Sequence, residues 1–116
     1  MTHITPVDEE TYALLQEIMA DEFTELVEFF LTDTEQSLVL LQHCVATQDS
    51  TQVGTLCHKL KSSSKLIGAF QLAEFTNLLE DYKDHHDQQI ARTHLNHLCA
   101  EFTQVVGWLK QKPAIA

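Results

Sequence analysis

The stretch that decides the fold is residues 53–68, which have the sequence VGTLCHKLKSSSKLIG. Its apolar residues recur three, four or seven positions apart, which is the spacing of one face of an α-helix. They are Val53, Leu56, Leu60 and Ile67. Gly68 follows directly, and glycine is the residue that most readily takes the left-handed conformation at a helix end. We therefore predict an amphipathic helix over about 51–67 that ends at Gly68.

The rest of the chain carries the same periodicity and few breaks. Three glycines and two prolines in 116 residues leave little material for the tight turns of a β-sheet. The predicted helices cover about 6–19, 21–47, 51–67, 70–85 and 88–111. Four long amphipathic helices joined by short polar connections predict an all-α fold, an antiparallel up-down four-helix bundle preceded by a short N-terminal capping helix. We expect residues 1–116 to form one domain.

Local signals mark where these helices begin. Thr5 stands before Pro6, a pattern typical of an N-cap followed by a proline in the first helical position. Either Asp49 or Ser50 is a suitable N-cap for the helix over 51–67.

Charge and composition exclude several classes of function. Seven basic against 17 acidic residues give a net charge of −10, which argues against nucleic acid or a membrane surface as the partner. No apolar run approaches the roughly 20 residues that span a bilayer. The N-terminus lacks the basic and apolar segments of a secretory signal, and the chain has three cysteines, an odd number. We therefore expect a cytoplasmic protein with reduced thiols.

The surface around His58 is unusual for an acidic protein. At roughly 100° per residue, His58 lies almost opposite the apolar stripe and should point to solvent. Gly54, one turn before it, has no side chain, and Ser62, one turn after it, has a small one. Lys61 and Lys65 flank it. The pattern predicts an exposed imidazole on an open, locally basic strip.

This combination suits the reversible capture of a phosphoryl group. Neutral imidazole is a good nucleophile at physiological pH and can form a phosphoramidate. The ammonium group of Lys61 could offset the charge of the phosphate. The small neighbours would let the active site of another protein approach the ring. The alternative is that His58 is exposed by chance, as one of seven histidines.

The residues around His58 also resemble a family motif. The sequence has HKLKSS at 58–63, GA at 68–69 and LE at 79–80. This pattern resembles that of histidine-containing phosphotransfer (HPt) domains, the relay modules of multistep two-component signalling: His-x-Leu-Lys-Gly-Ser, a glycine ten residues after the histidine, and a later Leu-Glu. The resemblance covers essentially the whole chain and implies a short helix followed by a four-helix bundle.

The resemblance implies roles for individual residues. His58 would carry the phosphoryl group on Nε2, and Lys61 would stabilise it. Glu80 would accept a hydrogen bond from the Nδ1–H group and so orient the imidazole. Gly54, Ser62 and Lys65 would belong to the face on which a receiver domain docks. One position departs from the pattern, because Ser62 stands where the family usually has glycine, and its side chain either narrows access to His58 or adds a hydrogen bond.

The same resemblance implies the partners and the cofactors. The chain would accept a phosphoryl group from an aspartyl phosphate on a receiver domain, often that of a hybrid sensor kinase, and pass it to the receiver of a response regulator. The receiver would supply the catalytic carboxylates and Mg²⁺, so the chain would be a phosphocarrier rather than an enzyme, with no cofactor of its own. No nucleotide-binding motif is present in the sequence. We expect a monomer.

Two other functions are weighed against this one. A helical adaptor would bind a signalling partner without phosphotransfer. A metal-binding bundle would use His94 and His97, three apart on one helix, with His85 and His86, but no further zinc-binding motif supports this ligand set. A thiol nucleophile at Cys57 is disfavoured because adjacent helical residues diverge by about 100°, so we expect it at the edge of the core.

Overall fold

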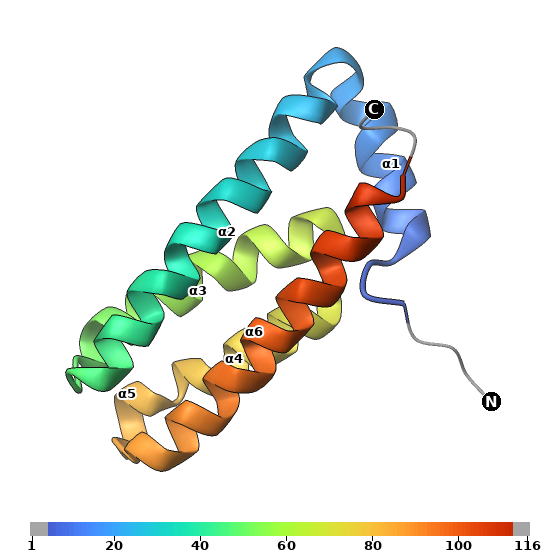
Figure 1. Ribbon diagram of the computed structural model, residues 1–116. Helices are drawn as coiled ribbons and strands as arrows, with labels where there is room; N and C mark the ends of the chain where they lie inside the picture. The colour runs from blue at the N-terminus through green and yellow to red at the C-terminus, as the bar shows by residue number, and fades with distance from the viewer. Residues whose placement is uncertain (1–4, 113–116) are drawn as a thin grey trace.

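The computed structural model describes residues 5–112, and in that range the chain forms helices and turns without a strand. The elements in chain order are α1 (Glu9–Met19), the 3₁₀ turn η1 (Ala20–Glu22), α2 (Phe23–Ala46), α3 (Ser50–Ile67), α4 (Phe70–Glu80), α5 (Tyr82–His85) and α6 (Gln88–Lys110) (Figure 1).

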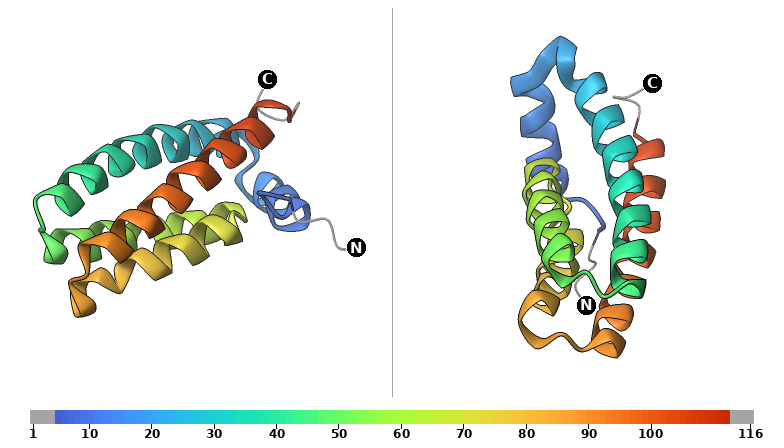
Figure 2. Two further views of the ribbon diagram at one scale, coloured as in Figure 1. Left: turned by 60° about the horizontal axis from the view of Figure 1, so that its bottom comes forward. Right: turned by 90° about the vertical axis from the view of Figure 1, so that its left-hand side faces the viewer.

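The four long helices form a closed bundle. Helix α2 contacts α3, α3 contacts α4, α4 contacts α6, and α6 returns to α2, with the chain running up and down between them (Figures 1 and 2). The predicted all-α four-helix bundle with a short N-terminal helix is therefore confirmed. Within residues 5–112, no helix combines the length and apolar character needed to cross a bilayer.

Helix α1 closes one end of the bundle, where α6 finishes (Figure 1). The ring of Tyr12 packs edge-on against Phe23 at the start of α2 and against Trp108 near the end of α6, with centroid distances of 5.0 Å in both cases. Aromatic pairs in this geometry add stability beyond the area that they bury. Tyr12 thus ties the short helix to both α2 and α6, and Leu15 of the same helix is buried as well.

The ends of α3 follow the local signals of the sequence. Asp49 is the N-cap, because its carboxylate accepts the backbone N–H of Gln52 at 3.2 Å. Gly68 ends the helix in the left-handed region, with φ of 92°. The predicted stop at Gly68 is confirmed, and of the two predicted caps the structure selects Asp49.

Helix α1 begins later than predicted. It starts at Glu9, not near residue 6, and Asp8 caps it by accepting the backbone N–H of Thr11 at 3.0 Å and the hydroxyl at 2.6 Å. The hydroxyl of Thr5 instead donates to the backbone carbonyl of Val7. Val7 is fully buried. The predicted cap at Thr5 is therefore wrong, because burial of Val7 holds the chain before Asp8 in a turn.

The predicted helix over 70–85 is interrupted at Asp81. The N–H group of Asp81 bonds to the carbonyl of Leu78, three residues back, and α5 starts at Tyr82. This tighter turn redirects the chain, so α5 contacts α3 while the side chain of Tyr82 stays buried. The break matters for the site, because it brings the next residue, Lys83, to α3.

Candidate functional site

The side chain of His58 projects from the middle of α3 and is 74% exposed, so the predicted exposure is confirmed. Its position relative to the core differs from the prediction. The buried face of α3 includes Gly54, Cys57 and Ser64, whereas Leu56 is only half-buried. The buried face is therefore rotated toward α4 and α5, and His58 lies at its edge rather than opposite to it. At this edge a side chain of α4 can reach the imidazole.

That side chain is Glu80, the last residue of α4, which is only 8% exposed. One carboxylate oxygen, Oε2, lies 3.9 Å from Nδ1 of His58. This distance is longer than a hydrogen bond, so the geometry brings the predicted partners together without joining them. A carboxylate beside Nδ1 favours the tautomer that keeps a proton there.

Two lysines donate to the same carboxylate. Nζ of Lys61 lies 2.7 Å from Oε1 of Glu80, and Nζ of Lys83 lies 3.1 Å from Oε2. These hydrogen bonds, first that of Lys61, hold the pKa of Glu80 below its ordinary value despite burial. The glutamate is therefore a carboxylate at neutral pH.

Lys61 is oriented toward α4 rather than toward the imidazole. Besides Glu80, its ammonium group donates to the side-chain oxygen of Asn77 at 3.3 Å, and its side chain is only 22% exposed. The residue expected to bind the phosphate thus lies close to the site, with its charge directed at α4.

Lys83 is a site residue that the sequence analysis missed. Its aliphatic stem crosses over Gly54, where an added Cβ would lie 3.1 Å from Cδ of Lys83. Gly54 was expected on an open surface and is buried instead, because α5 covers it with this side chain. The Glu80–Lys83 spacing of three residues, which suits a helical ion pair, was the available signal.

Two surface depressions adjoin the site, one lined in part by His58 and one lined in part by Lys61. The first, called here the His58 depression, is lined by Thr51, Gly54, Thr55, His58, Glu80 and Lys83. The second is lined by Lys61, Lys65, Phe70, Ala73, Glu74 and Asn77. The two lysines that share Glu80 therefore belong to different depressions.

The other two residues expected on the docking face are exposed. Ser62 donates its hydroxyl to the backbone carbonyl of His58 at 3.3 Å, so the hydroxyl faces the helix backbone rather than the ring. Lys65 lies one turn after Lys61 and lines the second depression.

The alternative sites have no comparable geometry. Cys57, expected at the edge of the core, is fully buried, and burial raises the pKa of its thiol to about 12, so it is not a nucleophile. Among residues 5–112, no group of three or more side chains could hold a metal ion. His97 packs against the ring of Phe75, and Nδ1 of His85 accepts the N–H of Asp87.

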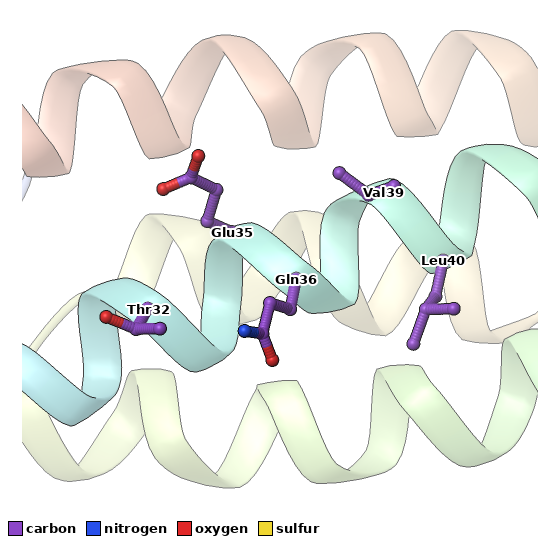
Figure 3. Close-up of a pocket in the computed structure, with 5 residues that line it drawn as sticks. All are labelled: Thr32, Glu35, Gln36, Val39 and Leu40. Atoms are coloured by element: carbon purple, nitrogen blue, oxygen red, sulfur yellow. The ribbon is translucent and has the colours of Figure 1, made fainter.

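A further depression lies on α2 and is lined by Thr32, Glu35, Gln36, Val39 and Leu40 (Figure 3). All of its lining residues come from one helix (Figure 3). Glu35 and Val39 extend toward one neighbouring helix, and Gln36 and Leu40 extend toward another (Figure 3). None of these five lining residues is a histidine or a cysteine.

The sequence model of the Hpt domain family matches residues 25–108. The chain belongs to the Hpt domain family. The matched range includes α3 with His58 and α4 with Glu80. Hpt domains carry phosphoryl groups and interact with receiver domains of two-component systems, so the chain is a phosphocarrier module rather than an enzyme.

The fold of this Hpt domain is also that of a solved structure. The crystal structure of histidine-containing phosphotransfer protein B (HptB) from Pseudomonas aeruginosa PAO1 superimposes with a TM-score of 0.88 and 28% sequence identity. The match covers 94% of this chain and 95% of HptB. The structural match therefore covers more of the chain than the family model does. None of the curated proteins matches the chain.

Proposed function

We propose that this Hpt domain is a phosphorelay intermediate that carries the phosphoryl group on Nε2 of His58. It accepts the group from an aspartyl phosphate on one receiver domain, such as that of a hybrid sensor kinase, and passes it to the receiver of a response regulator. The observation that carries the proposal is the exposed imidazole with a buried carboxylate beside Nδ1. This arrangement leaves Nε2, across the ring, as the nucleophile.

The transfer step exchanges one bond for another. The lone pair of Nε2 attacks the phosphorus atom of the aspartyl phosphate, so a P–N bond forms while the P–O bond to the aspartate breaks and its electron pair returns to the carboxylate. The imidazole keeps its Nδ1 proton and becomes positively charged. Glu80, whose carboxylate is 3.9 Å from Nδ1, stabilises this charge. Transfer to the second receiver is the reverse reaction.

The partner supplies the remaining chemistry of the proposed step. The receiver brings the acidic residues and the Mg²⁺ ion that neutralise charge on the phosphoryl oxygens, and this chain holds no cofactor of its own. The open surface around His58 leaves room for the receiver to approach. In the proposed relay the chain acts as a monomer in the cytoplasm, where receivers of response regulators operate.

Phosphotransfer profiling tests the proposal. Purified receivers, phosphorylated with radiolabelled acetyl phosphate, are incubated with the wild type, with His58→Gln and with His43→Gln, a control that removes an exposed histidine of α2. We expect acid-labile label on the wild type and on His43→Gln, and none on His58→Gln. Because His58 is exposed, its variant should melt within about 0.5 kcal/mol of the wild type.

Two outcomes of this experiment would contradict the proposal. Label that persists on His58→Gln would place the phosphoryl group elsewhere. A wild type that binds receivers of the panel and takes up no label would identify the helical adaptor.

A further inference from the structure

The His58 depression has a cation of its own. Of the six residues that line it, Lys83 is the one with a positively charged side chain. Lys61, which the sequence motif points to, lines the second depression and donates to Asn77 as well. A phosphoryl group that rests in the depression beside His58 therefore faces Lys83 first.

The fold holds Lys83 at this place by two contacts. The stem of the side chain packs against Gly54. A Cβ atom added at residue 54 would lie 3.1 Å from Cδ of Lys83, so a larger residue at this position would require the lysine side chain to shift. The ammonium group donates to Oε2 of Glu80, the same oxygen that faces Nδ1 of His58. The side chain remains 46% exposed, so its charged end is free to move within the depression.

We propose that Lys83 is the phosphate-binding lysine of the His58 depression, and that its ammonium group moves from Glu80 to the phosphoryl group when His58 is phosphorylated. This inference rests on the proposed function. A phosphoryl group carries up to two negative charges and three acceptor oxygens. It therefore competes well for the ammonium group of Lys83 with the carboxylate of Glu80, which also accepts from Lys61.

The exchange has a consequence for the imidazole. In the structure, Oε2 of Glu80 accepts from Lys83 at 3.1 Å and lies 3.9 Å from Nδ1 of His58. When Lys83 leaves, Oε2 loses this donor and can accept the Nδ1–H group of the positively charged ring, while Lys61 keeps Oε1. Phosphorylation would thereby strengthen the contact that stabilises the phosphohistidine.

The test uses phosphoramidate as a small phosphodonor, which removes receiver docking from the measurement. The wild type, Lys83→Gln, Lys83→Arg and the control Lys110→Gln are phosphorylated at His58. Lys110→Gln removes the same charge from an exposed position near the end of α6. The second ionisation of the phosphoryl group is followed by ³¹P NMR against pH, and its half-life is measured in parallel.

We expect Lys83→Gln to raise the pKa of the phosphoryl group and to change the half-life of the phosphohistidine by up to about fivefold, the size expected of a solvent-exposed ion pair. Lys83→Arg should restore the pKa, and Lys110→Gln should not move it. A purely structural role of Lys83 would alter the melting temperature without changing the pKa of the phosphoryl group.

The result separates this inference from the function on which it rests. A wild type that takes label at His58 while Lys83→Gln leaves both pKa and half-life unchanged would overturn the role of Lys83 and leave the relay intact. A wild type without label at His58 would overturn both. An effect equal in Lys83→Gln and Lys110→Gln would show a general effect of net charge and refute the direct contact.

Discussion

Replacement of Gly54 by alanine should separate the stability of α3 from the geometry of the site. Gly54 lies inside the helix, where alanine is favoured over glycine by about 0.5–1 kcal/mol. The added Cβ would meet three atoms of one side chain, at 3.1 Å from Cδ, 3.5 Å from Cβ and 3.8 Å from Cγ of Lys83. Because this neighbour is a flexible, half-exposed lysine, it can move away at low cost.

The expected magnitude follows from a second glycine. Gly107 lies on α6 with no atom within 4 Å of an added Cβ, so Gly107→Ala reports helix propensity alone. For 116 residues, 1 kcal/mol corresponds to about 4 °C in melting temperature, so Gly107→Ala should gain about 2–4 °C. Gly54→Ala should stabilise the fold less than Gly107→Ala does, because the added Cβ displaces Lys83 from Glu80. The difference in the free energy of unfolding should be roughly 0.2–1 kcal/mol, which is what such an ion pair is worth at an exposed site.

The assay is a double-mutant cycle by thermal or urea unfolding. In a Lys83→Ala background the lysine stem is absent, so Gly54→Ala should recover the full gain of Gly107→Ala. In the Lys83-containing chain, Gly54→Ala should also slow phosphotransfer, because the ammonium group is displaced from the His58 depression. A gain equal to that of Gly107→Ala in both backgrounds would refute the packing of Lys83 over Gly54.

Three further predictions concern the other site residues. Lys61→Ala should slow transfer by about tenfold or less and destabilise the fold by about 1 kcal/mol, because Glu80 loses a donor; unchanged kinetics and stability would remove Lys61 from the site. Ser62→Gly should keep transfer at a helix-propensity cost of about 0.5 kcal/mol. Ser62→Arg should slow transfer from a receiver without changing the circular dichroism spectrum. If Ser62→Arg transfers at the wild-type rate, the receiver does not approach over this face. The hydrogen bond donated by Lys61 lowers the pKa of Glu80. The ionised carboxylate of Glu80 therefore stabilises the fold at neutral pH, and this contribution is lost as the pH falls below the ordinary glutamate range. When the pH is lowered from about 7 to 3, the free energy of unfolding measured with urea should therefore fall less for Glu80→Gln than for the wild type. Parallel curves of this free energy against pH would contradict the ion pairs of Glu80.

Local signals predicted most of the fold. The stop at Gly68 depends on residues next to it in the chain, so the sequence alone sufficed, and for the cap of α3 the sequence narrowed the choice to Asp49 and Ser50. The break at Asp81 was missed because buried residues on both sides of it, such as Leu79 and Tyr82, keep helical spacing across the turn. A periodic pattern does not reveal a change of direction that preserves which residues are buried.

The predicted site residues were those of α3 and, through the family motif, Glu80 of α4. The spacing on α3 singled out His58 and Lys61, whose roles stay predictions, but the predicted orientation of the buried face was wrong because Gly54 and Ser64 are buried without being apolar. Lys83 was missed because its contact with α3 depends on the turn at Asp81, a tertiary feature. Residues brought together by packing between helices are not visible in the periodicity of either helix.

The distribution of charge gives the site a character opposite to that of the whole chain. The net charge is −10, yet four of the seven basic residues lie on α3 and α5: Lys59, Lys61, Lys65 and Lys83. Glu80 accepts from two of these lysines and Asp33 pairs with a third, so two carboxylates pair directly with three of the four lysines. A locally positive surface on an acidic protein attracts a phosphorylated, acidic active site to one orientation and repels acidic partners elsewhere. In the proposed relay, this distribution of charge would direct the receiver to His58.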